Sequence, residues 1–273
     1  MIKRILVISA IALTILAFEH QPSFSQVTQQ WVARYNGPGN LDDFADYSLA
    51  VDGSGNVYVT GYSAGSGTSS DYATIKYNSS GVQQWVARYN GPGNSYDEAT
   101  SLAVDGSGNV YVTGYSIDSG TSSDYYATVK YNSSGVQQWV ARYNGPGNSY
   151  DYAVSLAVDG SGNVYVTGSS YGSGTSIDYA TIKYNSSGVQ QWVASYNGPG
   201  NSDDRTYSLA VDGSGNVYVR GSSYGSGTYY ATIKYNSSGV QQWVARYNGP
   251  GNLDDECYFT CSGRFRQCLC DRL

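Results

Sequence analysis

The segment "SLAVDGSGNVYVTG", residues 48–61, decides the fold of this chain because it returns three more times. Its copies span residues 101–114, 155–168 and 208–221, and only the last differs, with Arg in place of Thr. In each copy the turn residues "DGSGN" separate two short runs rich in Val, Leu and Tyr, which is the pattern of two strands joined by a tight turn. The sequence therefore predicts the same β-hairpin at four places.

A larger repeat surrounds these hairpins. Five tryptophans head nearly identical segments, "WVARYNGPGN" or a close variant, at spacings of 51 to 54 residues: Trp31, Trp85, Trp139, Trp192 and Trp243. Each unit adds two more strand-like runs, "DYATIKYN" (71–78) and "QQWVARYN" (83–90) in the first unit, joined by the turn "NSSG". Four short strands per unit without helical periodicity predict a four-stranded antiparallel meander.

Units of this length and strand count are typical of propeller blades. We expect an all-β fold, a β-propeller of about four four-stranded antiparallel blades over residues 26–256, with four complete units and a fragment of a fifth. Apolar side chains alternate onto both sides of each strand pair, as a sheet covered by neighbours on both faces requires. The set could be a fragment of a larger propeller, or the strand at Trp31 or Trp243 could close a four-bladed ring. A β-solenoid and a β-sandwich are the alternatives.

The repeats also resemble a known family. The phrases "DYATIKYN", "GVQQWVARYNGPGN" and "SLAVDGSGNVYVTG" resemble the bacterial SBBP β-propeller repeat, and the core "VDGSGNVYV" is similar to NHL repeats. The resemblance runs through whole units, from residue 31 to about residue 256. It implies a secreted or surface-exposed propeller, often part of a longer chain, with no assigned chemistry.

The N-terminus has the pattern of a secretory signal peptide. Lys3 and Arg4 precede an apolar run from Ile5 to Phe18, and small residues follow, with cleavage expected after Ser25. An anchoring helix is the alternative, but the run is shorter than the roughly 20 residues that a membrane span requires. We therefore predict that residues 1–25 are removed, that the chain is secreted or held at the cell surface, and that no membrane span remains.

The tail, residues 257–273, breaks the repeat and contains all four cysteines: Cys257, Cys261, Cys268 and Cys270. Written in suitable codons and read one base later, "FTCSGRFRQCLCDRL" (259–273) translates as "SLAVDGSGNVYVTG", the segment that the repeat would place there. We interpret residues 257–273 as a frameshifted, disordered tail. A metal site or disulfide in an oxidising compartment is the alternative.

Composition argues against several function classes. The formal net charge of −6 gives no electrostatic basis for binding nucleic acid. Signal cleavage would remove His20, the only histidine, which excludes a Ser-His-Asp triad and a histidine zinc site. A paired-carboxylate hydrolase remains open by residue type, yet the repeat aspartates recur in every unit. We expect no enzyme and no catalytic residue.

One side of the propeller carries the candidate binding residues. The "NGPGN" and "GSGTSS" loops lie on the side where the units differ most, and we predict a binding surface there that includes Tyr62, Tyr115, Tyr171 and Tyr224. On the same side, Asp43, Asp97, Asp151 and Asp204 each follow "GPGN" by three residues and could form a weak Ca²⁺ ring; we expect no other cofactor. Alternatively, each Asp caps its own turn or pairs with an arginine such as Arg88 or Arg142.

The expected function is that of a secreted or cell-surface, non-enzymatic scaffold or interaction module whose partner is an extracellular protein or glycan. A multivalent lectin-like binder with one weak glycan site per blade is the alternative, and a hydrolase is a second one. An open propeller could also self-associate, because near-identical blades can pair between chains.

Overall fold

The computed structural model describes residues 28–118, 123–225 and 227–249. The chain divides into a unit of residues 1–30 and a unit of residues 31–273, and all described strands belong to the second. The predicted signal peptide, residues 1–25, and the predicted frameshifted tail, residues 257–273, lie outside the described residues. No helix in the described ranges is long and apolar enough to cross a membrane.

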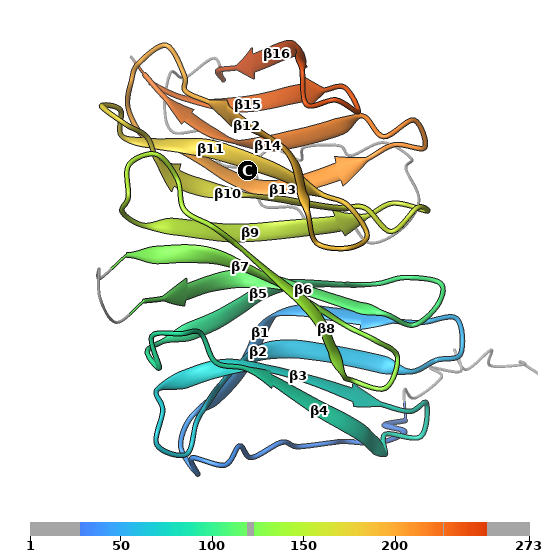
Figure 1. Ribbon diagram of the computed structural model, residues 1–273. Coiled ribbons are helices and arrows are strands. Elements are labelled where there is room, and N and C mark those ends of the chain that lie inside the picture. Colours follow the sequence, from blue (N-terminus) through green and yellow to red (C-terminus); the bar gives the residue numbers. More distant parts are fainter. Residues whose placement is uncertain (1–27, 119–122, 226, 250–273) are drawn as a thin grey trace, which may run out of the picture. The chain divides into compact units, whose positions relative to one another are not determined.

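Four antiparallel sheets make up the described fold, and each takes four consecutive strands in chain order (Figure 1). The first sheet contains β1 (Asp43–Val51), β2 (Val57–Ala64), β3 (Ser70–Tyr77) and β4 (Gln83–Tyr89). The second contains β5 (Asp97–Val104), β6 (Val110–Ile117), β7 (Asp124–Tyr131) and β8 (Gln137–Tyr143). The third contains β9 (Asp151–Val158), β10 (Val164–Tyr171), β11 (Ile177–Tyr184) and β12 (Gln190–Tyr196). The fourth contains β13 (Asp204–Val211), β14 (Val217–Tyr224), β15 (Thr228–Tyr235) and β16 (Gln241–Tyr247). The expected all-β fold of four-stranded blades is confirmed.

The "DGSGN" turn forms as the sequence predicts. In the first sheet Val51 pairs with Val57 across the turn, and Gly55 takes a φ of 78° that side chains disfavour. The Asp52 carboxylate accepts hydrogen bonds of 2.9 Å from the N–H groups of Ser54 and Asn56. Because the side chain satisfies two backbone donors that the tight turn leaves without strand partners, the aspartate fixes the hairpin locally.

Neighbouring sheets pack through two unlike surfaces. The first, here called the tyrosine face, consists in the first sheet of Ala50, Tyr58, Tyr72, Trp85, Ala87 and Tyr89. The second, here called the valine face, consists in the second sheet of Leu102, Val104, Val110, Val112, Val129 and Tyr131. The tyrosine face of each sheet packs on the valine face of the next, and equivalent clusters join the second sheet to the third and the third to the fourth.

The same polar contacts mark all three interfaces. The Leu102 N–H donates to Ser48 Oγ at 2.9 Å, and equivalent bonds join Leu156 to Ser101 and Leu209 to Ser155. On the outer strand, Trp85 Nε1–H donates to the Ser133 carbonyl at 3.1 Å, and Trp139 and Trp192 repeat this contact. Each sheet-to-sheet interface is therefore fixed in register by hydrogen bonds as well as by apolar packing.

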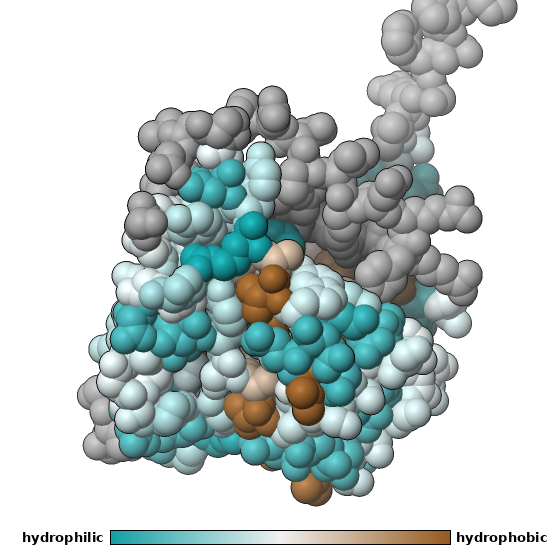
Figure 2. Space-filling view, turned by 90° about the horizontal axis from the view of Figure 1, so that it is seen from above, coloured by the Kyte–Doolittle hydropathy of each residue, from teal (hydrophilic) through white to brown (hydrophobic). Residues whose placement is uncertain are grey.

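Among the described strands the packing order is open. The innermost strands pack as β1 on β5, β5 on β9 and β9 on β13, whereas the first and fourth sheets share no contact of comparable extent among the described strands. Leu49 on the first valine face is 63% exposed, against 7% for its counterpart Leu102. Tyr247 on the fourth tyrosine face is 52% exposed, against 8% for Tyr89. Seen from above, hydrophobic side chains reach the surface in separate patches among polar ones (Figure 2).

The segment at Trp31 does not pair with the fourth sheet. Trp31 instead covers Gly81 of the first sheet, and its ring lies 6.2 Å from that of Tyr77. Trp85 covers Gly135 of the second sheet in the same way. Residues 31–35 thus occupy the place that the outermost strand of a preceding sheet would take.

Candidate functional site

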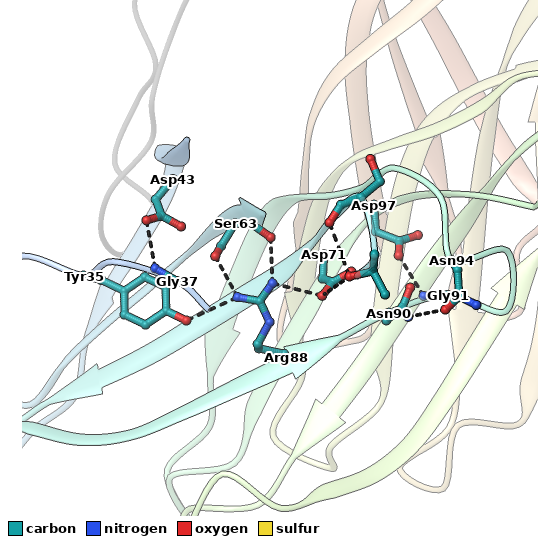
Figure 3. Close-up of polar contacts among 12 residues, drawn as sticks. Tyr35, Gly37, Asp43, Ser63, Asp71, Arg88, Asn90, Gly91, Asn94 and Asp97 are labelled. Carbon is teal, nitrogen blue, oxygen red and sulfur yellow. Dashed lines mark hydrogen bonds and ion pairs between the residues drawn. The ribbon is translucent and has the colours of Figure 1, made fainter. Parts of the chain in front are cut away.

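The four aspartates of the predicted calcium ring are turn caps. Asp97 Oδ2 accepts a hydrogen bond of 2.7 Å from the Gly91 N–H, which closes the "NGPGN" loop (Figure 3). The same bond joins Asp43 to Gly37, Asp151 to Gly145 and Asp204 to Gly198. Each carboxylate serves its own loop, and no three His, Cys, Asp or Glu of the described residues gather where they could hold a metal ion. The geometry favours the capping interpretation over the calcium ring.

Burial changes the protonation of these caps. It raises the pKa of Asp97 to about 6, although the Ser116 hydroxyl and the Gly91 N–H lower it by hydrogen bonding. Burial likewise raises the pKa of Asp151 to about 6. The fold buries these carboxyl groups although burial disfavours their charged form, so the aspartates serve a structural role as turn caps.

The arginine of "WVARYN" has a partner other than the loop aspartate. Arg88 forms an ion pair of 2.9 Å with Asp71 and donates to the Ser63 carbonyl at 2.7 Å (Figure 3). In the second sheet the position of Asp71 is taken by Tyr125, and Arg142 lies 4.8 Å over its ring. The acidic partner of Arg88 is therefore Asp71, which is not one of the four loop aspartates.

A continuous row of aromatic rings crosses the loop side of the first three sheets; we call it the tyrosine row. Successive ring centroids lie 4.8 to 6.3 Å apart, within the range of favourable aromatic contact. In order, the row consists of Phe44, Tyr62, Tyr96, Tyr115, Tyr152, Tyr150 and Tyr171. Rings from three sheets thus form one surface.

A buried carboxylate holds the middle of the row. Glu98 Oε2 accepts hydrogen bonds from the hydroxyls of Tyr96, at 2.9 Å, and Tyr115, at 2.8 Å. Burial raises the pKa of both tyrosines, so both hydroxyls stay protonated and donate. The two rings are therefore held in one orientation before any ligand arrives.

A pocket of about 430 Å³ opens beside these rings. Its lining residues are Ser95, Tyr96, Tyr115, Ile117, Asp118, Asp124, Tyr150 and Tyr152. Aromatic faces supply flat apolar contact area, and the carboxylates of Asp118 and Asp124 supply hydrogen-bond acceptors. Such a lining suits a ligand that has both apolar faces and hydroxyl or amide donors.

Three of the four predicted binding tyrosines, Tyr62, Tyr115 and Tyr171, belong to this row. They do not all occupy the same position in the repeat. Tyr62 and Tyr115 are equivalent, whereas Tyr171 is displaced by two residues along its strand. Tyr224, the counterpart of Tyr171, lies on the fourth sheet, where its N–H donates to the Asp203 carbonyl. The structure therefore brings Tyr62, Tyr115 and Tyr171 together and leaves Tyr224 outside.

Four row residues that come from the "NGPGN" loops and the strands after them were not predicted from the sequence: Phe44, Tyr96, Tyr150 and Tyr152. A signal was present, because "NSYD" in the second and third units stands against "NLDD" and "NSDD" in the other two. In the fourth sheet the positions of Tyr150 and Tyr152 are taken by Asp203 and Arg205, which form an exposed ion pair of 2.9 Å. The described tyrosine row therefore ends at the third sheet. It forms one asymmetric surface and does not repeat as a separate site in each sheet.

Comparison with solved structures supports the architecture. An α-L-arabinofuranosidase from Fusarium graminearum matches with a TM-score of 0.50 and 12% identity, over 79% of this chain and 70% of that one. A protein of unknown function from Dyadobacter fermentans matches with a TM-score of 0.51 and 10% identity, over 73% and 67%. A gluconolactonase from Xanthomonas campestris matches with a TM-score of 0.40 and 17% identity, over 71% and 59%. The likenesses to the arabinofuranosidase and to the Dyadobacter protein show the fold alone. The first two structures found are matched over 60% and 65% of their own lengths.

The sequence comparison is more specific. No curated protein sequence matches the chain. The repeat described as "Beta-propeller repeat", SBBP, matches four times, at residues 30–67, 84–120, 138–174 and 191–227, which together make up more than half of the chain. The last three matches run from the outer strand of one sheet (β4, β8 or β12) into the two inner strands of the next sheet, and the first match covers the equivalent positions from residue 30. The chain belongs to the SBBP β-propeller repeat family.

Proposed function

We propose that the chain is a non-enzymatic interaction module, outside the cell or on its surface, that holds its ligand against the tyrosine row. The observation that carries this proposal is the continuity of the row across three sheets beside a pocket of about 430 Å³. Tyrosine is a frequent anchor at binding surfaces because a rigid, amphipathic ring gives a large contact area for little lost conformational entropy.

Of the two expected partner classes, protein and glycan, the pocket lining favours a glycan. The apolar face of a sugar ring can lie on Tyr150 or Tyr152, while its hydroxyls donate to Asp118 and Asp124 in the same pocket. The row is continuous and asymmetric, so this proposal is for one extended site with an oligosaccharide lying along it. It replaces the idea of one weak site per blade.

The experiment is a glycan array followed by calorimetry with single-site variants. Tyr150→Ala and Tyr152→Ala remove exposed rings from the row, so the fold should survive both changes. Tyr207→Ala is the matched control, because Tyr207 is 40% exposed, against 46% for Tyr150, and belongs to the fourth sheet beyond the row. We expect each row variant to weaken binding by about tenfold or more and the control to bind normally. Equal losses in all three variants would contradict the assignment.

The proposed location rests on the N-terminal pattern alone. Basic Lys3 and Arg4 followed by the apolar run to Phe18 are typical of an exported chain. Expression with the native N-terminus and sequencing of the exported product should give a first residue near Gln26. A product that stays inside the cell with Met1 retained would contradict the proposed export. The proposed ligand site would still be tested separately by the glycan array and calorimetry.

A further inference from the structure

The pocket of about 430 Å³ beside the tyrosine row carries negative charge in its wall. Asp118 and Asp124 both line it, and an ionised carboxylate accepts hydrogen bonds but donates none. Of the described residues that line the pocket, none is Lys, Arg or His. A ligand in this pocket therefore meets two acidic side chains that no basic lining residue neutralises.

The hydroxyl protons of three lining tyrosines already belong to carboxylates. Tyr96 and Tyr115 donate to Glu98 at 2.9 and 2.8 Å. The Tyr152 hydroxyl hydrogen-bonds to Asp124, and burial raises the pKa of Tyr152, so this hydroxyl stays protonated and is the donor. A hydroxyl has a single proton to donate, so these three groups can only accept a hydrogen bond from a ligand. The pocket is therefore rich in acceptors and poor in donors.

The fold keeps Asp124 where its charge is unfavourable. Its residue is only 2% exposed, and burial raises the pKa of the carboxyl, although the hydrogen bond with Tyr152 lowers it. Arg142 of the same sheet contacts the ring of Tyr125, and consecutive residues of a strand point to opposite faces, so this guanidinium belongs to the other face. A positively charged group bound in the pocket would favour the ionised form of Asp124.

The aromatic rings of the pocket add a second attraction for a cation. The ring centroids of Tyr115 and Tyr152 lie 4.8 Å apart with their planes at 71°, whereas Tyr150 lies nearly parallel to Tyr152, at 13°. All three rings line the pocket. The face of an aromatic ring is electron-rich and attracts ammonium groups, most strongly where water is excluded. Ring faces and carboxylates therefore favour the same kind of ligand group.

We propose that this pocket selects a cationic amino sugar, so that the ligand of the tyrosine row is an oligosaccharide with free, protonated amino groups. The inference rests on the function proposed above and names the class of glycan. An ammonium group brings a positive charge and several N–H donors to Asp118 and Asp124, whereas a sugar hydroxyl or an acetamide brings one donor and no charge. An acidic sugar would be repelled by the same carboxylates.

The test compares three tetrasaccharides by calorimetry with the full chain: the β-1,4-linked tetramers of glucosamine, N-acetylglucosamine and glucose. They share linkage and length and differ in one substituent of each sugar, which is an ammonium, an acetamide or a hydroxyl group. At a pH where the amino groups are protonated, we expect the glucosamine tetramer to bind at least about tenfold more tightly than the other two. Added salt should reduce this advantage, because it screens the charges, and should leave the binding of the neutral tetramers unchanged.

Two charge-removing variants assign the preference to the pocket. Asp118→Asn keeps the size of the side chain and removes its charge, and Asp118 is partly exposed, so the variant should fold. We expect it to weaken binding of the glucosamine tetramer about tenfold and to leave binding of the N-acetylglucosamine tetramer unchanged. Asp203→Asn is the matched control, because it removes the same charge from the loop side of the fourth sheet, beyond the row, where Asp203 forms an exposed ion pair with Arg205. The control should bind all three tetramers as the wild type does.

The outcomes separate this inference from the proposed function. Equal binding of the three tetramers by the wild type, lost in Tyr152→Ala, would overturn the preference for a cation and leave the tyrosine row as the ligand site. Equal losses in Asp118→Asn and Asp203→Asn would overturn it too, because the attraction would then come from the charge of the whole molecule. If no tetramer binds and the row variants bind every ligand found on the array as the wild type does, the proposed function itself fails, and this inference fails with it.

Discussion

The open packing order predicts that one leucine substitution has very different costs at two positions of the same repeat. Leu156 and Leu49 both lie in the sequence "SLAVDGSGNVYVTG", at the same position of the innermost strand. Leu156 is 8% exposed beneath the second sheet, whereas Leu49 is 63% exposed. A buried Leu→Ala change costs about 2–5 kcal/mol, from lost transfer energy and a residual cavity. For Leu49 most of the side chain already contacts water, so we expect a cost of about 1 kcal/mol or less.

The assay is urea unfolding followed by Trp fluorescence, at a protein concentration where sedimentation shows single copies. We expect Leu156→Ala to lower the free energy of unfolding by about 3 kcal/mol and the difference between the two variants to be about 2 kcal/mol. For a chain of this size that difference corresponds to roughly 4–8 °C in melting temperature. The shared sequence context cancels local propensity from the comparison, so only the neighbouring sheet distinguishes the two sites.

Equal costs for Leu49→Ala and Leu156→Ala in single copies would refute the reasoning. Such a result would mean that the first valine face is covered within the chain, as in a closed ring. A change in the slope of unfolding free energy against urea would instead indicate that the sheets unfold separately, which linear arrays permit.

Three further predictions concern single residues. Gly135→Ala and Gly108→Ala both place an alanine at a left-handed φ near +78°, which costs about 1–2 kcal/mol. Only at Gly135 would the new Cβ also lie 2.7 Å from the indole of Trp85. In urea unfolding, Gly135→Ala should therefore lower the free energy of unfolding more than Gly108→Ala does. Ser195→Arg should place a guanidinium beside Asp178, as in the first sheet, and stabilise the fold by up to about 1 kcal/mol; no gain in melting temperature would contradict this. Burial raises the pKa of Asp97 from 3.8 to about 6. Between these values the folded state binds a proton that the unfolded state does not, so the free energy of unfolding should fall as the pH rises from about 4 to 6. Asp97→Asn should flatten this part of the pH profile of stability, and an unchanged profile would contradict the raised pKa of Asp97.

Much of the fold follows from interactions between residues that are close together in the sequence. The turn "DGSGN" positions Asp52 to cap its own hairpin, and this needs no distant residue. Alternation of Val57 and Val59 with Tyr58 predicts a sheet with two apolar faces, and Tyr58 is indeed fully buried. In the tyrosine row, Tyr62, Tyr115 and Tyr171 could be singled out from the sequence because they stand in the loops and strand ends that vary between units; their role in binding stays a prediction.

The rest of the site could not be predicted because it depends on neighbours from different units. Tyr115 meets Tyr152 of the next sheet at 4.8 Å, although 37 residues separate them in sequence. Glu98 stands next to Asp97 in the sequence without any sign of a partner, yet it is buried and accepts hydrogen bonds from two tyrosine hydroxyls of the row. The calcium ring likewise stays a prediction from sequence, since the distance between loop aspartates is set by how whole sheets pack.

The number of units, the four strands in each, their turns and the two-faced character of every sheet follow from the sequence, because strand pairing and tight turns depend on residues close together in the chain. Which faces are covered depends on how the sheets pack. Leu49 and Leu102 are identical in type and local sequence, yet one faces water and the other is buried, because burial is a property of the neighbouring sheet and no residue encodes it locally.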